Sequence, residues 1–172
     1  MHWSTYYQLA DRTVMTEPSL RDLLGKLSEL APARPPASQA EIDSSERRLG
    51  IRLSADFAFA YATLNGTIEP TPVENGWIEL WPLTRWFTVE EYVRDWPEPN
   101  RKGFAPLSSA IVFADYSIES WHYAAHFSAT SVQPAALIYL LHLQPHLVAD
   151  SLQGFLAAAL VDDPAIYPPT TA

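Results

Sequence analysis

The sequence predicts an α+β domain, in which N-terminal helices precede a mostly antiparallel β-sheet and a C-terminal helix closes the chain. Three observations lead to this fold class. Apolar residues recur at three- and four-residue steps up to residue 65, strand-like segments dominate between residues 77 and 142, and a further helical pattern follows residue 150. Helices followed by a run of strands are typical of α+β domains. At 172 residues the chain suits a single domain.

Three helices are predicted before the strands begin. The first covers residues 19–30, whose five leucines fall on one helical face. A proline-rich linker follows, because each proline fixes its own φ and biases the preceding residue away from helix. The second helix begins at Ser38, with a glutamate three residues on as its capping-box partner, and ends at Gly50 in a left-handed cap. The third is capped by Ser54 and is closed by the Asn65-Gly66 pair.

Strand composition takes over in the second half of the chain. The strand candidates are residues 77–81, 104–107, 111–116, 121–127 and 135–142. A short helix is predicted over residues 88–95, since a threonine can cap it and two glutamates fall in its first turn. The last helix is predicted over residues 151–161, and the prolines that follow it are expected to prevent any further regular element.

The residues between Ile42 and Gly66 carry a resemblance to a known family. They hold an apolar residue and a glutamate on one helix, a leucine–glycine pair, an acidic–aromatic step and an asparagine–glycine pair: Ile42, Glu46, Leu49-Gly50, Asp56-Phe57 and Asn65-Gly66. In this order they resemble the SUKH superfamily, which includes fungal cell-wall-synthesis regulators of the Smi/Knr type and many bacterial immunity proteins. Ser54 stands where proline is usual in that family. Looser matches at residues 77–83, 111–117 and 150–156 extend the resemblance over roughly residues 38–160.

The resemblance implies a non-enzymatic binding domain of SUKH-like fold. We therefore divide the chain into an N-terminal extension with one helix and a proline-rich linker (residues 1–37), a SUKH-like domain (38–163) and a C-terminal tail (164–172). Bacterial members imply an immunity protein that neutralises a cognate toxin. The alternative is an intracellular scaffold or regulatory protein of the Smi/Knr type, for which the leucine face of residues 19–30 could dock on a partner.

Charge is unevenly distributed along the chain, whose net charge is −9. Residues 61–172 hold four Lys or Arg against twelve Asp or Glu, and no Lys or Arg follows Lys102. Such a field repels nucleic-acid phosphates and anionic membranes and attracts a basic partner. We therefore expect a protein partner, such as a basic toxin domain, and neither nucleic acid nor membrane. An acidic surface also simply keeps a protein in solution, so charge alone does not name the partner.

Compartment is predicted from what the sequence lacks. The chain has no cysteine, which fits a reducing environment, and its first residues do not follow the basic-then-apolar pattern of a secretory signal. No stretch approaches the roughly 20 apolar residues that span a bilayer. We expect a cytoplasmic protein. Its oligomeric state does not follow from the sequence.

Patterns that carry catalysis or bind metals are weak in this sequence. The absence of cysteine excludes thiol nucleophiles and cysteine-based zinc sites, and neither a Gly-x-Ser-x-Gly elbow nor a glycine-rich phosphate loop occurs. His122 and His126 fall in a predicted strand, where residues four apart lie roughly 13 Å from each other. Pro145 separates His142 from His146. We expect no enzyme activity, no cofactor and no metal.

The candidate binding surface follows from strand parity. In the segment from Trp77 to Trp81, alternate side chains share a face, so Trp77, Glu79 and Trp81 point together when Ile78 and Leu80 enter the core. Tryptophan is enriched at binding hot spots, although core packing is its commoner use. Acidic residues on neighbouring segments complete the predicted partner-binding set, which is Glu69, Glu74, Trp77, Glu79, Trp81, Asp115 and Glu119.

Overall fold

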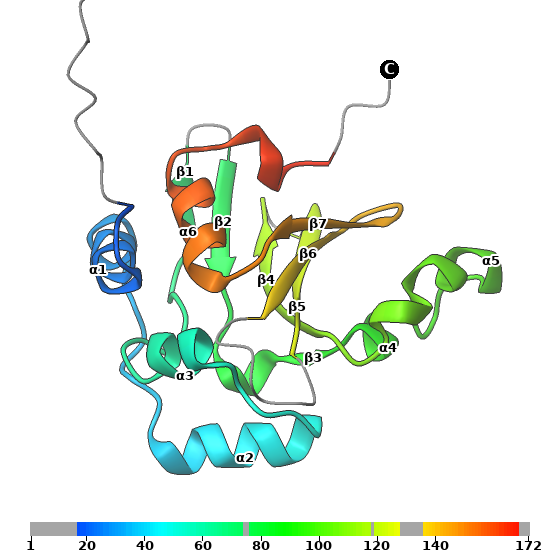
Figure 1. Cartoon of the computed structure of the whole chain (residues 1–172), viewed down its shortest axis with the longest axis horizontal. Coiled ribbons are helices and arrows are strands. Elements are labelled where there is room, and N and C mark those ends of the chain that lie inside the picture. The colour runs from blue at the N-terminus through cyan, green and yellow to red at the C-terminus, as the bar shows by residue number, and fades with distance from the viewer. Residues whose placement is uncertain (1–16, 74–75, 118, 128–135, 169–172) are drawn as a thin grey trace, which may run out of the picture.

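A computed structural model of the chain describes residues 17–73, 76–117, 119–127 and 136–168. Within them the α+β fold predicted from the sequence is confirmed: six α-helices accompany one antiparallel seven-stranded sheet in a single domain (Figure 1). The helices are α1 (Leu20–Leu30), α2 (Gln39–Leu49), α3 (Ala55–Tyr61), α4 (Val89–Tyr92), α5 (Glu98–Arg101) and α6 (Leu152–Leu160). The strands are β1 (Thr71–Val73), β2 (Gly76–Leu80), β3 (Phe87–Thr88), β4 (Ile111–Tyr116), β5 (Trp121–His126), β6 (Leu137–Leu141) and β7 (Pro145–Ala149). Three 3₁₀ turns are η1 (Leu83–Arg85), η2 (Lys102–Leu107) and η3 (Pro164–Ile166).

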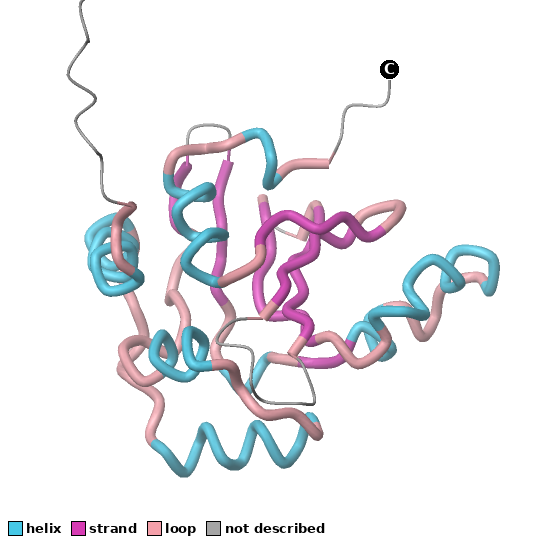
Figure 2. The backbone as a smooth tube through the Cα atoms, viewed as in Figure 1, coloured by secondary structure: helices cyan, strands magenta, loops and turns pink. Residues whose placement is uncertain are grey.

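The sheet runs in the order β1-β2-β4-β5-β6-β7, and β3 pairs with β4 beyond the end of β2. Every pairing is antiparallel. The register shifts between Val112 and Ala114, which places a β-bulge at Phe113 in the central strand. Figure 2 shows the strands gathered into one layer, with helices around it.

Local side-chain chemistry fixes the ends of the long helices. Ser38 and Glu41 form the predicted capping box at the start of α2, and Gly50 ends that helix with a left-handed φ of 67°. Ser54 occupies the N-cap position of α3, but its hydroxyl donates to Asp56 rather than capping the helix. The other carboxylate oxygen of Asp56 accepts the Leu152 N–H at 2.8 Å. Asp56 thereby ties the start of α3 to the start of α6.

One face of the sheet is covered by α1, α3 and α6. Phe155 of α6 packs on the rings of Phe113 and Tyr123, with centroid separations of 5.7 and 4.7 Å. Phe57 of α3 reaches the same Phe113 ring at 5.1 Å. Three leucines of α1 are buried in this core, namely Leu23, Leu24 and Leu27. The N-terminal helix is therefore packed against the domain.

The opposite face meets α4 and the segment that follows it. Tyr92 of α4 packs on His122 of β5, with ring centroids 4.9 Å apart. In Figure 1 the chain from α4 to α5 extends away from the sheet. This arrangement leaves part of the second face, at β2 and β4, for the side chains of the candidate surface.

Several elements differ from the sequence-based predictions. Residues 102–107 form the η2 turn where a strand was predicted over 104–107, because Pro106 lacks the N–H that a strand needs. The α4 helix ends at Tyr92, short of the predicted residue 95. Strands β1 and β7 were not predicted. Within the expected tail, Pro164–Ile166 form the η3 turn, and Ile166 is buried.

No helix among the described residues is both long and apolar enough to cross a membrane.

Candidate functional site

Cross-strand pairing brings three polar side chains together on the second face of the sheet. Glu79 of β2 lies opposite Asp115 of β4, and Asp115 lies opposite His122 of β5. Residues directly opposite each other in antiparallel strands project from the same face. The sequence separates Glu79 from Asp115 by more than thirty positions, so only the fold creates this row.

Arg85 joins the carboxylates of this row. Its guanidinium lies 3.1 Å from Glu79 Oε1, 3.7 Å from Asp115 Oδ2 and 2.8 Å from Glu119 Oε1. The planar fork of an arginine can contact several acceptors in fixed directions, which a lysine ammonium does not. We call these four residues the Arg85 cluster. Three carboxylates share one guanidinium, so the cluster keeps a formal excess of two negative charges.

Trp81 forms the floor of the Arg85 cluster. The predicted exposure of Trp81 is wrong, because only 1% of this residue is accessible. Its parity is as predicted: the indole Nε1 donates to Asp115 Oδ2 at 2.8 Å, on the face that carries Glu79. The side chain is covered from above by the Arg85 guanidinium, 4.0 Å from the ring centre, and by the Phe87 ring at 5.6 Å. The chain that follows β2 thus folds back over it.

Trp77 remains on the surface beside the cluster. It is 48% exposed, and it precedes Glu79 by two residues on the same face of β2. Ile78 and Leu80 are buried on the other face, as the alternation predicted. The backbone of Trp77 is held by Ser117, whose N–H donates to the Trp77 carbonyl at 2.8 Å. A large apolar side chain is therefore presented from a strand that is paired on both sides.

Glu119 is placed by the turn between β4 and β5. Ser117 and Glu119 adopt positive φ values of 46° and 62°, a conformation uncommon for residues other than glycine. The Ser120 side chain donates to the Ser117 carbonyl at 2.8 Å, and its N–H donates to Tyr116. The turn directs the exposed Glu119 carboxylate onto Arg85.

The remaining predicted site residues lie elsewhere. Glu69 is exposed in the loop before β1 and makes no polar contact with the Arg85 cluster among the described residues. Glu74 lies outside the described residues. The structure thus gathers Glu79, Trp81, Asp115 and Glu119, and leaves Trp77 at their edge.

Arg85, His122 and Tyr92 belong to the site and were not predicted. A signal for Arg85 existed, since no other Lys or Arg occurs between Arg52 and Arg94. His122 is buried, and its Nδ1 lies 3.2 Å from the Tyr92 hydroxyl. Tyr92 thereby extends the polar row, through His122, from the sheet to α4.

Burial sets the protonation of this pair. The pKa of His122 is lowered mainly because burial disfavours the imidazolium, although the Asp115 and Glu119 carboxylates act in the opposite direction. Burial, and then the negative charge of Glu119, raises the pKa of Tyr92. Both side chains are therefore neutral near pH 7, and the charge of the surface comes from the Arg85 cluster. Among the described residues, no three His, Asp or Glu side chains are grouped to hold a metal ion.

Neither a scan against protein-family models nor a search of curated proteins finds a match to this chain. The resemblance to the SUKH superfamily stays a prediction that rests on the residues between Ile42 and Gly66.

Proposed function

We propose that this protein is a non-enzymatic binding domain that captures a basic protein through Trp77 and the Arg85 cluster. The observation that carries the proposal is the arrangement of three carboxylates around one guanidinium, next to a half-exposed tryptophan on the same face of β2. Charge attracts and orients a basic partner, and a buried aromatic anchor supplies affinity.

The geometry of the cluster suits recognition of a cationic side chain. Arg85 holds Glu79 and Glu119 in place before any partner arrives, so little side-chain freedom remains to be lost on binding. Glu119 is mostly exposed and can accept from an incoming Lys or Arg. Asp115 is buried, so it does not contact the partner; it accepts a hydrogen bond from Trp81 and holds that side chain beneath Arg85. The acidic second half of the chain extends the attraction over a longer range.

A toxin domain is the partner class that we favour. This part of the proposal rests on the resemblance to bacterial immunity proteins and on the sign of the charge, since many toxins that act on nucleic acids are basic. A cytoplasmic location would follow from that role. The alternative, a scaffold or regulatory protein of the Smi/Knr type, would use the leucine face of α1, but Leu23, Leu24 and Leu27 are buried against the domain.

The test is affinity capture of the tagged full chain from cells that produce it, with quantitative mass spectrometry. We compare wild type with Trp77→Ser and Glu119→Lys, and with matched controls Ile68→Ser and Glu29→Lys, which change an exposed apolar and an exposed acidic residue elsewhere. Loss of a hot-spot side chain costs at least about 2 kcal/mol, or roughly thirtyfold in affinity.

We expect one basic polypeptide in near-equal amount with wild type and both controls, and its depletion with both site variants. A second capture in high salt should weaken the wild-type interaction. A partner that is retained equally by all five proteins would place the interface elsewhere and overturn the proposal. Recovery of acidic partners alone would overturn it as well.

A further inference from the structure

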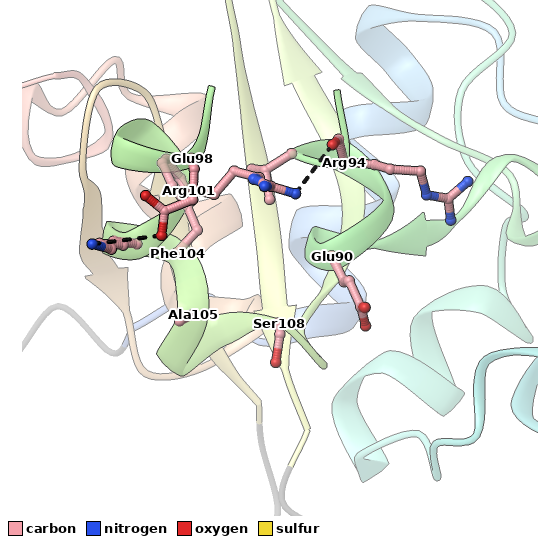
Figure 3. A pocket seen from close by; sticks show the side chains of 9 residues that line it. Glu90, Arg94, Glu98, Arg101, Phe104, Ala105 and Ser108 are labelled. Carbon is pink, nitrogen blue, oxygen red and sulfur yellow. Dashed lines mark hydrogen bonds and ion pairs between the residues drawn. The ribbon is translucent and has the colours of Figure 1, made fainter. Parts of the chain in front are cut away.

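A pocket separate from the Arg85 cluster lies between α4, α5 and η2 (Figure 3). Its volume of about 480 Å³ falls in the range of sites that hold small ligands. Val93 and Phe104 are buried beneath it, the exposed Ala105 contributes apolar surface, and charged side chains from α4, α5 and the residues that follow these helices surround it. The hollow therefore combines an apolar surface with charged walls.

The pocket gathers three of the four cations in the second half of the chain. Residues 61–172 contain four Lys or Arg side chains. Arg85 belongs to the acidic cluster, and the other three, Arg94, Arg101 and Lys102, all line this pocket. A region with an excess of acidic residues thus has one place where positive charge collects.

Two of these cations already have partners. Lys102 lies 3.5 Å from Glu98, and Arg94 lies 3.7 Å from Glu91. Exposed pairs of this kind contribute little to stability, but they satisfy the charges that they join. Of the charged residues that line the pocket, one cation and one anion are left outside these two ion pairs.

Arg101 and Glu90 are the charges that remain. The Arg101 guanidinium makes one hydrogen bond among the described residues, to the Arg94 carbonyl at 3.4 Å, and no carboxylate lies within ion-pair distance. The Glu90 carboxylate has no polar partner in the described part of the chain. Figure 3 shows the two groups on different walls, Arg101 from α5 and Glu90 from α4. A guanidinium and a carboxylate that do not meet each other can each meet an opposite charge on a ligand.

We propose that this pocket binds a short peptide as a zwitterion. Arg101 donates to the peptide carboxylate, Glu90 accepts from its ammonium group, and an apolar side chain between them lies against the exposed Ala105. A single amino acid is too small for this role, because its two charges are adjacent whereas Arg101 and Glu90 lie on different walls. A simple anion would meet the repulsion of Glu90. The pocket is independent of the protein-binding surface at Trp77.

The experiment titrates the full chain, labelled with ¹⁵N, with the tripeptide Ala-Leu-Ala and follows amide shifts by NMR. Two blocked forms, with an acetylated N-terminus or an amidated C-terminus, each remove one charge. We expect millimolar or tighter binding of the free peptide with shifts centred on α4, α5 and η2. Each blocked form should bind about tenfold more weakly, since it loses one charge-assisted contact.

Variants assign each charge to its partner. Arg101→Gln should abolish the difference between free and amidated peptides, and Glu90→Gln should abolish the difference between free and acetylated peptides. Arg47→Gln and Glu29→Gln make the same charge changes at exposed positions on α2 and α1, and should keep both differences. All four positions are exposed, so the variants remain folded, which their amide spectra verify.

Equal binding of the three peptides, or no shift around the pocket at 10 millimolar peptide, overturns the proposal. Loss of discrimination in the control variants does so too. Trp77→Ser should leave peptide binding unchanged, so failure here is distinguishable from failure of the proposed function.

Discussion

Replacing Arg85 by methionine tests whether one guanidinium holds the acidic surface together. The substitution keeps much of the aliphatic stem above Trp81 and removes the charge that faces three carboxylates. Asp115 is affected most, because its side chain is only 3% exposed and cannot turn to bulk water. Removing the partner of a buried charge costs more than the pair contributed, since the remaining charge stays desolvated.

The magnitude follows from the geometry. Charges 3.7 Å apart attract by about 4.5 kcal/mol at an effective dielectric constant of 20. Arg85 is 36% exposed, and solvent screens it, so roughly half of this is lost. The Trp81 N–H continues to stabilise Asp115. We expect Arg85→Met to lower the free energy of unfolding by about 2 kcal/mol.

Urea unfolding at pH 7, followed by tryptophan fluorescence, measures this loss. Arg52→Met is the matched control, because Arg52 lies 3.1 Å from Glu46 but is 80% exposed, so its loss should be about 0.5 kcal/mol or less. Asp115→Asn should cost less in the Arg85→Met background than in wild type, which a double-mutant cycle reports. Equal losses for the two arginine variants would show that Arg85 does not stabilise a desolvated carboxylate.

Three further predictions concern backbone, protonation and surface. Gly66→Ala should destabilise the protein by about 3 kcal/mol, because φ is 79° and a Cβ would lie 2.5 Å from the Leu80 carbonyl oxygen of β2. The control Gly25→Ala, which lies in α1 with open space around it, should instead stabilise the protein by about 0.5 kcal/mol. Urea unfolding measures both changes. Burial lowers the pKa of His122, so the unfolded chain binds a proton that the folded chain excludes as pH falls below 6.5. Stability should therefore fall more between pH 7.5 and 5.5 in wild type and in the control His146→Gln than in His122→Gln; parallel curves for all three would contradict this. Trp77→Ser should change the unfolding free energy by less than about 1 kcal/mol, and a larger loss would mean that Trp77 is needed for folding.

The sequence predicts those elements whose ends depend on local chemistry. The capping box at Ser38 and the left-handed Gly50 require only residues within a few positions of each other, and both are found. The burial of Ile78 and Leu80 follows equally from the period of a strand. Such features need no knowledge of what packs against them.

Features that depend on distant partners could not be predicted in this way. Strand β1 has three residues and contains Pro72, and β7 begins at Pro145, so neither has a strong strand pattern. Both lie at edges of the sheet, where a proline can face away from the ladder. Trp81 shows the same limit at the site. Strand alternation predicts the face from which its side chain projects. It does not predict that Arg85 and Phe87, which follow β2, pack on the indole and bury it.

The position of the Arg85 cluster has a further physical consequence. One carboxylate would satisfy Arg85, yet three are held within 4 Å of its guanidinium, and the carboxylates gathered around it repel one another. The turn that presents Glu119 adds two residues with positive φ, each of which costs free energy for a side chain other than glycine. Both costs occur next to the half-exposed Trp77 on β2. Departures from local stability are expected where a protein acts, because binding there compensates for them. Their coincidence at this face is the physical reason to seek the partner at Trp77 and Glu119.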